Sequence, residues 1–482
     1  MSARLATVTV FVTSFCVLVL EILAGRLLAP VIGVSLESFT GIIGTVLAGI
    51  AAGNTFGGRL ADAQPPRALI GPAIMAGGAS SWLAPPITSA IATGAHLSPD
   101  PGTIVFLTVL TFFLPALILS SVTPMVAKLR LSDVGETGRV VGNLSAAGTF
   151  GALAGTFLTG FVLVAAFPTR RLIFLVGLGL VLFGAGLSGW SRLKPQAVGL
   201  GLVALLGLAS VFIPSPCDAE TAYACVEIEA DDDRPQGLGI VLNGSRNSYV
   251  DLDDPTYLEF RYMRLFADVV APRADSAAVD VLHLGGAGFT FPRYINAVRA
   301  GANSQVLEID AELVDYAEEE LALEQSDRLR VRTGDARLTI AAEADGSYDV
   351  IVGDAFSGLT IPWHLTTTEF VAELDRVLRP DGIVVANLID GEDLGFARAE
   401  LATYKAHFNH VALIRPQVQP DSDWPDSVAR NLMLIASDVP LPLIEVDPQD
   451  GILLDEADTT ALIDDAEVLT DDFAPVDQLR HT

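Results

Sequence analysis

Long apolar stretches occupy the first 213 residues of this 482-residue chain. A helix needs roughly 20 residues to cross a lipid bilayer, and about seven stretches reach that length. They lie near residues 5–25, 37–57, 68–92, 103–127, 143–167, 171–190 and 196–213. We therefore expect residues 1–213 to form a membrane α-helical bundle of about seven transmembrane helices, placed in the cell membrane as a multi-pass domain.

The charge of the chain changes at the same place. The whole sequence carries 58 acidic and 29 basic residues, a formal net charge of −29. Residues 1–213 hold 6 of the acids and 11 of the bases, whereas residues 214–482 hold 52 acids and 18 bases. Nucleic acid is not an expected partner of so acidic a domain, because its binding depends on cationic contacts to phosphate. We expect most of these acids to form a solvated surface.

Positive charges in the loops predict the orientation of the spans, because cytoplasmic loops are enriched in Lys and Arg. With the N-terminus inside, eight such residues fall on the cytoplasmic side and only Arg26, Arg170 and Arg171 on the outer side. Seven spans then put residues 214–482 outside, and one miscounted span, most easily the proline-interrupted third, reverses this. Cys217 and Cys225 could close a hairpin with a disulfide, which needs an oxidising compartment; two free thiols are the alternative.

Short apolar strands alternate with helical stretches in the acidic half. A β-hairpin is expected over residues 225–242, with its polar turn at 231–237. Further strands are expected at residues 278–284, 304–309, 329–333, 348–352 and 383–388, the last preceded by a turn at 379–382. Repeated βα units of this length predict a parallel, doubly wound Rossmann-type sheet, whose ligands bind at the carboxyl ends of the strands.

Glycines or acids follow the first four strands of this predicted sheet. The glycines after the first strand let a ligand approach the backbone at a helix N-terminus. Glu308 ends the second strand, where it can accept hydrogen bonds from both ribose hydroxyls. Asp335 follows the third, placed to accept from an adenine amino group, and Asp354 follows the fourth. This order predicts a class I methyltransferase-like fold for a nucleoside sulfonium. Its binding residues are predicted to be Gly285, Gly286, Glu308, Asp335 and Ala336.

These residues resemble a narrower family, the polyamine aminopropyltransferases of the spermidine synthase type, in the subgroup fused to an N-terminal membrane region. The family moves an aminopropyl group from decarboxylated S-adenosylmethionine to an amine and releases methylthioadenosine. The resemblance covers nearly all of the acidic half. It includes Glu220-Thr221-Ala222-Tyr223, Leu242-Asn243-Gly244, residues 253–259, the 285–288 turn with Arg293, Glu308-Ile309-Asp310, Gly334-Asp335-Ala336, and residues 349–354, 367–382 and 469–477.

The resemblance implies roles on the amine side of the site. Asp354 matches the catalytic base that deprotonates the amine, and Tyr257 matches a tyrosine that orients it. Asn247 stands where the family has glutamine. Ser357 takes the place of the second acid in the family's Asp-Ser-Ser-Asp, and Gly288 that of an acid that binds the aminopropyl ammonium. The nucleoside half thus matches the family, while the polyamine half lacks two carboxylates.

The sequence predicts different locations for two histidines near this pattern. His283 lies on an apolar strand and is expected to be a core residue, whereas His364 is a candidate to line the crevice. No paired His or Cys has metal-ligand spacing, so no metal is expected. The Asp-rich segment 446–472 is expected to be a solvated surface rather than a calcium site, with Asp471 and Asp472 as the exceptions to examine.

We therefore expect a membrane-bound aminopropyltransferase-like enzyme that uses decarboxylated S-adenosylmethionine and a small-molecule amine such as putrescine. One alternative is a methyltransferase that uses S-adenosylmethionine itself. Another is a non-catalytic nucleoside- or polyamine-binding domain that regulates a transporter-like membrane half. The expected partners are the amine and the lipid bilayer, with a homodimer left open. Soluble sulfonium donors favour the cytoplasm for the acidic domain, whereas the charge count and the cysteine pair favour the outside.

Overall fold

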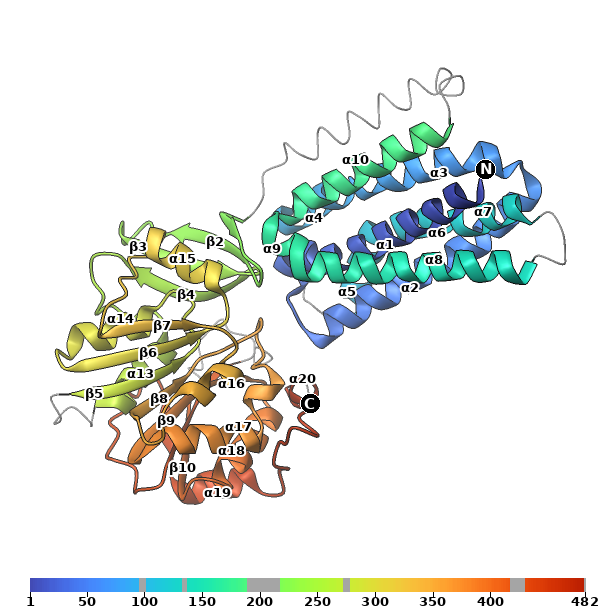
Figure 1. Ribbon diagram of the computed structural model, residues 1–482. Helices are drawn as coiled ribbons and strands as arrows, with labels where there is room; N and C mark the ends of the chain where they lie inside the picture. The colour runs from blue at the N-terminus through green and yellow to red at the C-terminus, as the bar shows by residue number, and fades with distance from the viewer. Residues whose placement is uncertain (95–100, 132–136, 189–216, 272–277, 417–429, 481–482) are drawn as a thin grey trace. The chain divides into compact units, whose positions relative to one another are not determined.

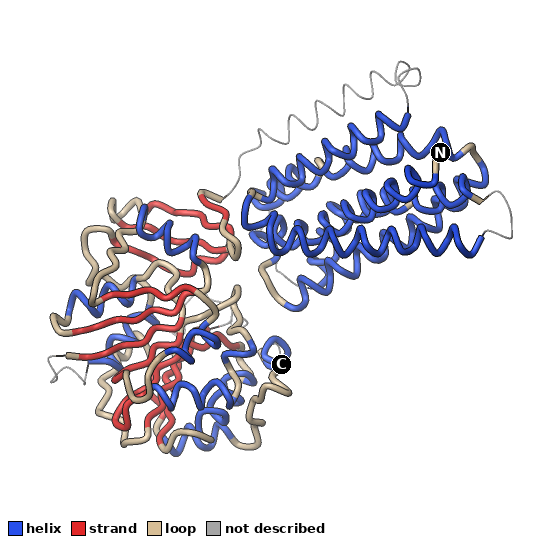
Figure 2. The backbone as a smooth tube through the Cα atoms, in the orientation of Figure 1, coloured by secondary structure: helices blue, strands red, loops and turns tan. Residues whose placement is uncertain are grey.

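The computed structural model describes residues 1–94, 101–131, 137–188, 217–271, 278–416 and 430–480. The chain divides into two compact units, Met1–Cys225 and Val226–Thr482. Figures 1 and 2 show helices throughout the described part of the first 188 residues, and every described strand follows residue 217. Each unit is described by itself below.

The first unit is a bundle of apolar helices. Five helical runs are long and apolar enough to cross a membrane, by length and composition: Ala3–Ile32, Leu36–Ala63, Pro101–Arg130, Thr137–Leu163 and Thr169–Ser188. They correspond to five of the predicted spans. The helices are α1 (Ala3–Ile32), α2 (Leu36–Ala63), α3 (Pro66–Ser81), α4 (Ala84–Gly94), α5 (Pro101–Thr108), α6 (Leu114–Ser120), α7 (Val122–Arg130), α8 (Thr137–Leu158), α9 (Val164–Ala166) and α10 (Thr169–Ser188).

The predicted third span is not one helix in the structure. Residues 68–92 are split between α3 and α4, with a turn at Trp82 and Leu83. Pro85 and Pro86 explain the break, because proline has no N–H to donate to the carbonyl four residues earlier. The predicted seventh span, residues 196–213, lies outside the described residues. Among the described residues, five of the seven predicted spans are therefore long and apolar enough to cross a membrane.

Small residues let the helices of the bundle approach closely. A Cβ atom on Gly151 or Gly155 of α8 would lie 2.3 or 2.5 Å from the carbonyl oxygen of Phe11 or Phe15 on α1. Such contacts are typical of helix packing in membranes. The outer face of α8 and its continuation is apolar, since Phe150 and Phe161 are 67% and 77% exposed. Apolar side chains therefore form both the interior and the outer face of this bundle.

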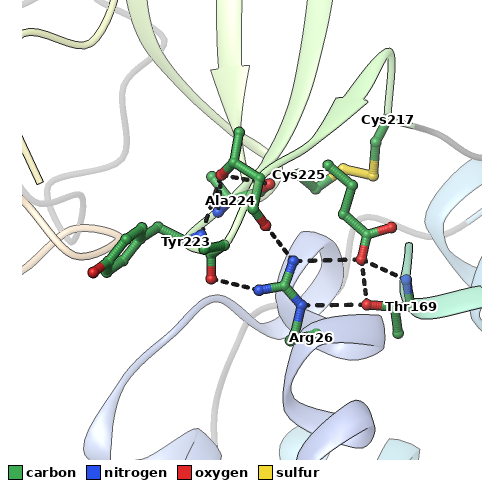
Figure 3. Close-up of polar contacts among 9 residues, drawn as sticks. Arg26, Thr169, Cys217, Tyr223, Ala224 and Cys225 are labelled. Atoms are coloured by element: carbon green, nitrogen blue, oxygen red, sulfur yellow. Dashed lines mark hydrogen bonds and ion pairs between the residues drawn. A yellow bond between two sulfur atoms is a disulfide. The ribbon is translucent and has the colours of Figure 1, made fainter. Parts of the chain in front are cut away.

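The segment that follows residue 216 is attached to one end of the bundle (Figure 3). Cys217 and Cys225 form a disulfide, which confirms one of the two alternatives for this pair. Arg26, near the C-terminal end of α1, donates to the carbonyl oxygens of Thr221 and Ala222.

Glu220 completes this attachment. It lies 3.5 Å from the Arg26 guanidinium and accepts from the backbone N–H of Thr169 at 2.9 Å. The side chains of Arg26 and Glu220 are only 17% and 15% exposed. A largely buried ion pair therefore holds residues 217–225 at the end of the bundle formed by the C-terminus of α1 and the N-terminus of α10.

After the helical bundle, the chain forms a sheet of four short strands. They are antiparallel where their register is defined, in the order β1 (Ala219–Glu220), β2 (Cys225–Ala230), β3 (Gly237–Leu242) and β4 (Ser245–Asp251). The β2–β3 pair is the predicted hairpin. The turn between β3 and β4 contains Asn243 and Gly244, both with positive φ, as a tight hairpin turn requires.

An eight-stranded sheet forms the core of the second unit. Its order is β12-β10-β11-β9-β8-β5-β6-β7, and β5 to β9 are parallel while β10 to β12 are antiparallel to their neighbours. The Rossmann-type class predicted for this half is confirmed. The strands are β5 (Val279–Leu284), β6 (Ala302–Glu308), β7 (Leu329–Thr333), β8 (Tyr348–Gly353), β9 (Leu378–Asp390), β10 (His410–Arg415), β11 (Arg430–Ser437) and β12 (Ile452–Leu454).

Helices cover both faces of this sheet. One apolar core contains side chains of β5, β8 and β9 with α16 (Ala336–Thr339), α17 (Thr368–Val377) and α18 (Gly395–Lys405). The other contains α13 (Arg261–Val270) and α14 (Thr290–Val298). The remaining helices are α15 (Ala311–Glu320), α19 (Glu456–Ile463) and α20 (Val476–Leu479).

One detail of the sheet differs from the prediction. The expected turn at residues 379–382 is a bulge within β9, since Leu378 pairs with Tyr348 and the next pair joins Ile383 to Val350.

The strand order also creates a crevice. From β5 the chain runs to β6 on one side, and β8 lies on the other side of β5. Adjacent parallel strands whose connections leave in opposite directions open a crevice at their carboxyl ends, where ligands of such folds bind.

Candidate active site

A cavity of about 970 Å³ opens at this crevice within the second unit. This volume is at the upper end of the range for small-molecule sites. It is lined by the turns after β5, β6, β7 and β8, by β4, by the segment that enters α13, and by residues of β9 and β11. The four strand ends singled out in the sequence therefore meet at one cavity.

The turn after β5 brings the backbone close to the end of β8. Gly285 has φ +87°, and a Cβ atom there would lie 2.5 Å from the carbonyl oxygen of Asp354. Both the conformation and the contact require glycine. The next two N–H groups, of Gly286 and Ala287, donate to one carboxylate oxygen of Glu308 at 2.7 and 3.4 Å.

Glu308 is fixed at the end of β6 by three backbone donors. Its second oxygen accepts from the N–H of Asp310 at 2.9 Å. The side chain is 6% exposed, and burial raises the pKa of the carboxyl above its usual value although the N–H donors lower it. Because the backbone fixes both oxygens, the carboxylate has one orientation at the wall of the cavity.

Asp335 and Ala336 lie at the next strand end and line the same cavity. One oxygen of Asp335 caps α16 by accepting from the N–H of Arg337 at 2.8 Å. The other lies 3.1 Å from Nε2 of His364, which also lines the cavity. His364 thus lines the cavity, as the sequence suggested. The sequence did not predict its contact with Asp335.

Asp354 occupies the centre of the crevice, directly after β8. Its Oδ1 accepts from Asn387 Nδ2 at 2.9 Å, and the Tyr262 hydroxyl hydrogen-bonds the same carboxyl group. Asn387 is itself held by Asn431, whose Nδ2 donates to Asn387 Oδ1 at 3.0 Å. Burial raises the pKa of Asp354 to about 6, against the opposing effect of these two hydrogen bonds. A carboxyl group of this kind can accept a proton near neutral pH.

Tyr262 and Asn387 were missed by the sequence analysis. Asn387 is a polar residue inside the buried apolar strand β9, which is a usable signal. Tyr262 comes from the start of α13, and only the fold brings it to the crevice.

The predicted amine-side residues lie in different places. Asn247 lines the cavity, and its Oδ1 accepts from the N–H of Leu242 at 3.3 Å across the β3–β4 turn. Tyr257 is not among the described residues that line the cavity. Its ring packs under the Arg234 guanidinium at 3.7 Å, and its hydroxyl donates to Glu259 at 2.5 Å. Ser357 is exposed and pairs with Thr360, while its neighbours Phe356 and Gly358 line the cavity.

Two further positions were singled out in the sequence. The His283 ring is buried, lies 3.2 Å from Ser304 Oγ, and has a pKa lowered by burial to about 3, as expected for a core histidine. Asp471 accepts from Thr367 and pairs with Arg337 at 2.6 Å. No group of three His, Cys, Asp or Glu among the described residues could hold a metal ion.

Comparison with known proteins identifies relatives of the second unit. A model described as a methyltransferase domain matches residues 282–386. A polyamine aminopropyltransferase of Vibrio vulnificus is 29% identical over 215 residues, which cover 42% of this chain and 69% of that protein. A polyamine aminopropyltransferase of Chromobacterium violaceum is 30% identical over 146 residues. The second unit is thus similar to polyamine aminopropyltransferases. The match to the Chromobacterium protein covers 30% of this chain and 55% of that protein.

Other matches include both an aminopropyl transferase and methyltransferases. A probable polyamine aminopropyl transferase of Bifidobacterium longum is 33% identical over 124 residues, about a quarter of each chain. Among solved structures, a probable spermidine synthase from Corynebacterium glutamicum aligns with 55% of this chain and 99% of its own, at 29% identity and a TM-score of 0.49.

All four strand-end positions lie inside the matched methyltransferase domain, since residues 282–386 contain Gly285, Glu308, Asp335 and Asp354. Gly288 also lies there, and its surroundings leave no room for an acid. A Cβ atom at this position would lie 2.7 Å from Ser248 Oγ and 3.0 Å from a methyl group of Val250.

Proposed function

We propose that the second unit transfers an alkyl group from a nucleoside sulfonium to an amine. The donor in this proposal is decarboxylated S-adenosylmethionine, the group moved is aminopropyl, and methylthioadenosine is released. The observation that carries the proposal is the position of Asp354, a carboxyl group with a pKa of about 6 at the crevice, in the same cavity as Glu308 and Asp335. The homology to aminopropyltransferases supports the reaction class.

The chemistry assigns one task to each carboxylate. The Glu308 carboxylate accepts hydrogen bonds from the ribose hydroxyls, and Asp335 accepts from the adenine amino group. Asp354 accepts a proton from the substrate ammonium, which frees the lone pair of the nitrogen. That nitrogen forms a bond to the carbon beside sulfur, and the carbon–sulfur bond breaks with both electrons staying on sulfur. Holding the two substrates in this geometry supplies most of the acceleration, because the sulfonium is already a good leaving group.

Replacing the base tests the proposal. Purified full-length protein should release methylthioadenosine from decarboxylated S-adenosylmethionine when putrescine or a related amine is supplied. In Asp354→Asn we expect a loss of at least 100-fold in turnover, as for other general bases, with donor binding retained. Asp232→Asn, at an exposed position of the β2–β3 turn, is the matched control. Release of methylthioadenosine by Asp354→Asn at the wild-type rate would refute the role of Asp354, and no release with any amine would refute the reaction.

A methyltransferase that uses S-adenosylmethionine is the second candidate. It is favoured by the Gly288 position, where the acid that would hold an aminopropyl ammonium has no room, and by the match to a methyltransferase domain. Calorimetry with the two donors separates the candidates: an aminopropyltransferase binds the decarboxylated donor more tightly, and a methyltransferase binds S-adenosylmethionine more tightly.

We further propose that the first unit spans a lipid bilayer. Five candidate spans and the exposed phenylalanines of α8 support this. Arg26 lies near the C-terminus of α1 and Thr169 begins α10, which marks one end of the bundle. The helix ends at the other end of the bundle carry the basic residues Arg4, Arg59, Arg67, Lys128 and Arg130. The positive-inside rule then assigns the end of the bundle that holds residues 217–225 to the outer side.

A further inference from the structure

The cavity has an unexpected set of charges on the side away from the nucleoside residues. Four arginines line it, Arg246 from β4, Arg261 and Arg264 from α13, and Arg430 from β11. In residues 214–482 acids outnumber bases by 52 to 18. On this side of the cavity the ratio is reversed, because the carboxylates that line it there are Glu259 and Asp354.

Arg264 is neutralised by its own structural contacts. Its guanidinium binds both oxygens of Asp450, at 2.9 and 2.6 Å, and donates to the carbonyl oxygens of Leu258 and Glu259. These bonds fix the segment that enters α13. Both carboxylate oxygens of Asp450 therefore already accept from Arg264, and the residue is only 8% exposed.

Arg261 and Arg246 hold weaker contacts. Arg261 Nε lies 3.9 Å from the same Asp450, and its side chain is 46% exposed. Arg246 Nε lies 3.9 Å from Glu229, and its side chain is 40% exposed. Asp268 and Asp447 also lie near Asp450 and Arg264, but neither lines the cavity. The lining on this side therefore holds four arginines against two carboxylates.

The two carboxylates on this side have partners of their own. Glu259 accepts the Tyr257 hydroxyl at 2.5 Å, and Asp354 accepts from Asn387 at 2.9 Å. A diamine would bring two ammonium groups to these two carboxylates and to several arginines, and like charges that face each other cost free energy. Guanidinium groups instead match carboxylates, which they bind through parallel hydrogen bonds.

We propose that this side of the cavity binds a carboxylate that lies next to an amino group, so that the substrate is an amino acid rather than a diamine. The proposal rests on the proposed function and specifies its substrate class. The carboxylate can belong to either of two substrates: the acceptor, as in a diamino acid, or the donor, as in S-adenosylmethionine. The chemistry recognised is the same in both cases.

A matched pair of acceptors tests the proposal, since ornithine and putrescine differ only by one carboxylate. Full-length protein in detergent is given decarboxylated S-adenosylmethionine with either amine, and S-adenosylmethionine with putrescine, and the thioether nucleoside released is measured. We expect kcat/KM for ornithine to exceed that for putrescine at least tenfold. Faster reaction of S-adenosylmethionine than of the decarboxylated donor would also support the proposal and assign the carboxylate to the donor.

Arginine variants link the preference to the cavity. In Arg261→Gln we expect the ornithine-to-putrescine ratio of kcat/KM to fall at least tenfold, with partial recovery in Arg261→Lys, which keeps the charge but not the planar fork. Arg330→Gln, an exposed position on β7, should keep the wild-type ratio.

Binding measurements decide the proposal independently of turnover. Calorimetry compares ornithine with putrescine on protein loaded with methylthioadenosine, and S-adenosylmethionine with its decarboxylated form on the unliganded protein. If the carboxylate-free member of each pair binds at least as tightly, the proposal is overturned, whether or not the reaction occurs. If the carboxylated member binds more tightly and no group is transferred, the proposed function fails while the binding preference stands.

Discussion

At the scale of the residue, the buried charge of Asp354 lowers the stability of the folded protein. Its folded-state pKa of about 6 lies above the ordinary value of 3.8, because burial disfavours the charged form. At pH 7 the carboxyl is nevertheless mostly ionised. The folded protein therefore holds a desolvated charge, which is what a proton acceptor in a crevice requires.

This cost predicts how stability depends on pH. The folded state binds the Asp354 proton more tightly than the unfolded state, so the carboxyl favours folding below about pH 4, and this contribution is lost as the pH rises through about 6. Asp354→Asn should therefore be more stable than wild type at pH 8, by roughly 2–3 kcal/mol, and should lose this advantage at pH 4. Thermal unfolding at both pH values measures the difference, and an advantage that does not change with pH would contradict the pKa.

The residue scale also limits what the sequence could predict. Glu308, Asp335 and Asp354 were found because each follows an apolar strand, and strand ends meet at one edge of a parallel sheet. Tyr262 and the arginines of the cavity come from a helix and from strands outside that pattern. Nothing in their local sequence shows that the chain returns them to the crevice.

At the scale of the element, the turn after β5 depends on one glycine. Alanine at position 285 would have to adopt φ +87° and place its Cβ 2.5 Å from the Asp354 carbonyl oxygen. We expect Gly285→Ala to lower the free energy of unfolding by about 2 kcal/mol or more and to weaken donor binding, because the Glu308 contacts of the same turn shift with it.

Gly346→Ala is the matched control for that change. Gly346 also has a positive φ, +58°, but a Cβ there meets nothing within 4 Å. Denaturant unfolding of both variants separates backbone strain from collision with the backbone of Asp354. Equal losses in the two variants would show that the contact with Asp354 has no energetic consequence.

Strands and helices of the second unit were largely predictable, because period and length distinguish buried strands from amphipathic helices. The bulge at residues 379–382 was not predicted, and for the break between α3 and α4 the sequence indicated only that proline interrupts the third span. Both contain proline, at Pro380 and at Pro85–Pro86, and this residue is compatible with a turn, a bulge or a helix break.

At the scale of the whole molecule, the side of the membrane on which the second unit lies is a testable proposal. A reporter that is active only outside the cytoplasm should be active when fused after Thr482. A fusion after Arg130, at the C-terminus of α7, should give the opposite result, since that end is assigned to the cytoplasm. A C-terminal fusion that is active only in the cytoplasm would reverse the assignment and favour cytoplasmic donors.

The two-part organisation was visible in the sequence because apolar content and acidic charge change together near residue 213. The compact units meet at Cys225 and Val226 instead. The difference arises because residues 217–225 follow the apolar region and carry the acids Asp218 and Glu220, but are held to the bundle by the contacts of Arg26 with Thr221 and Glu220. Composition indicates whether a segment favours water or an apolar environment, but it does not show which unit the segment packs on.

The cavity of about 970 Å³ shared by the nucleoside residues and Asp354 has a stereochemical consequence for the proposed reaction. The nucleoside residues and Asp354 line the same space, so donor and acceptor meet without a protein group carrying the alkyl fragment between them. One displacement inverts the carbon at which it occurs. A donor made chiral there with deuterium would therefore give a product of the opposite handedness, whereas a carried fragment would undergo two inversions and retain its configuration.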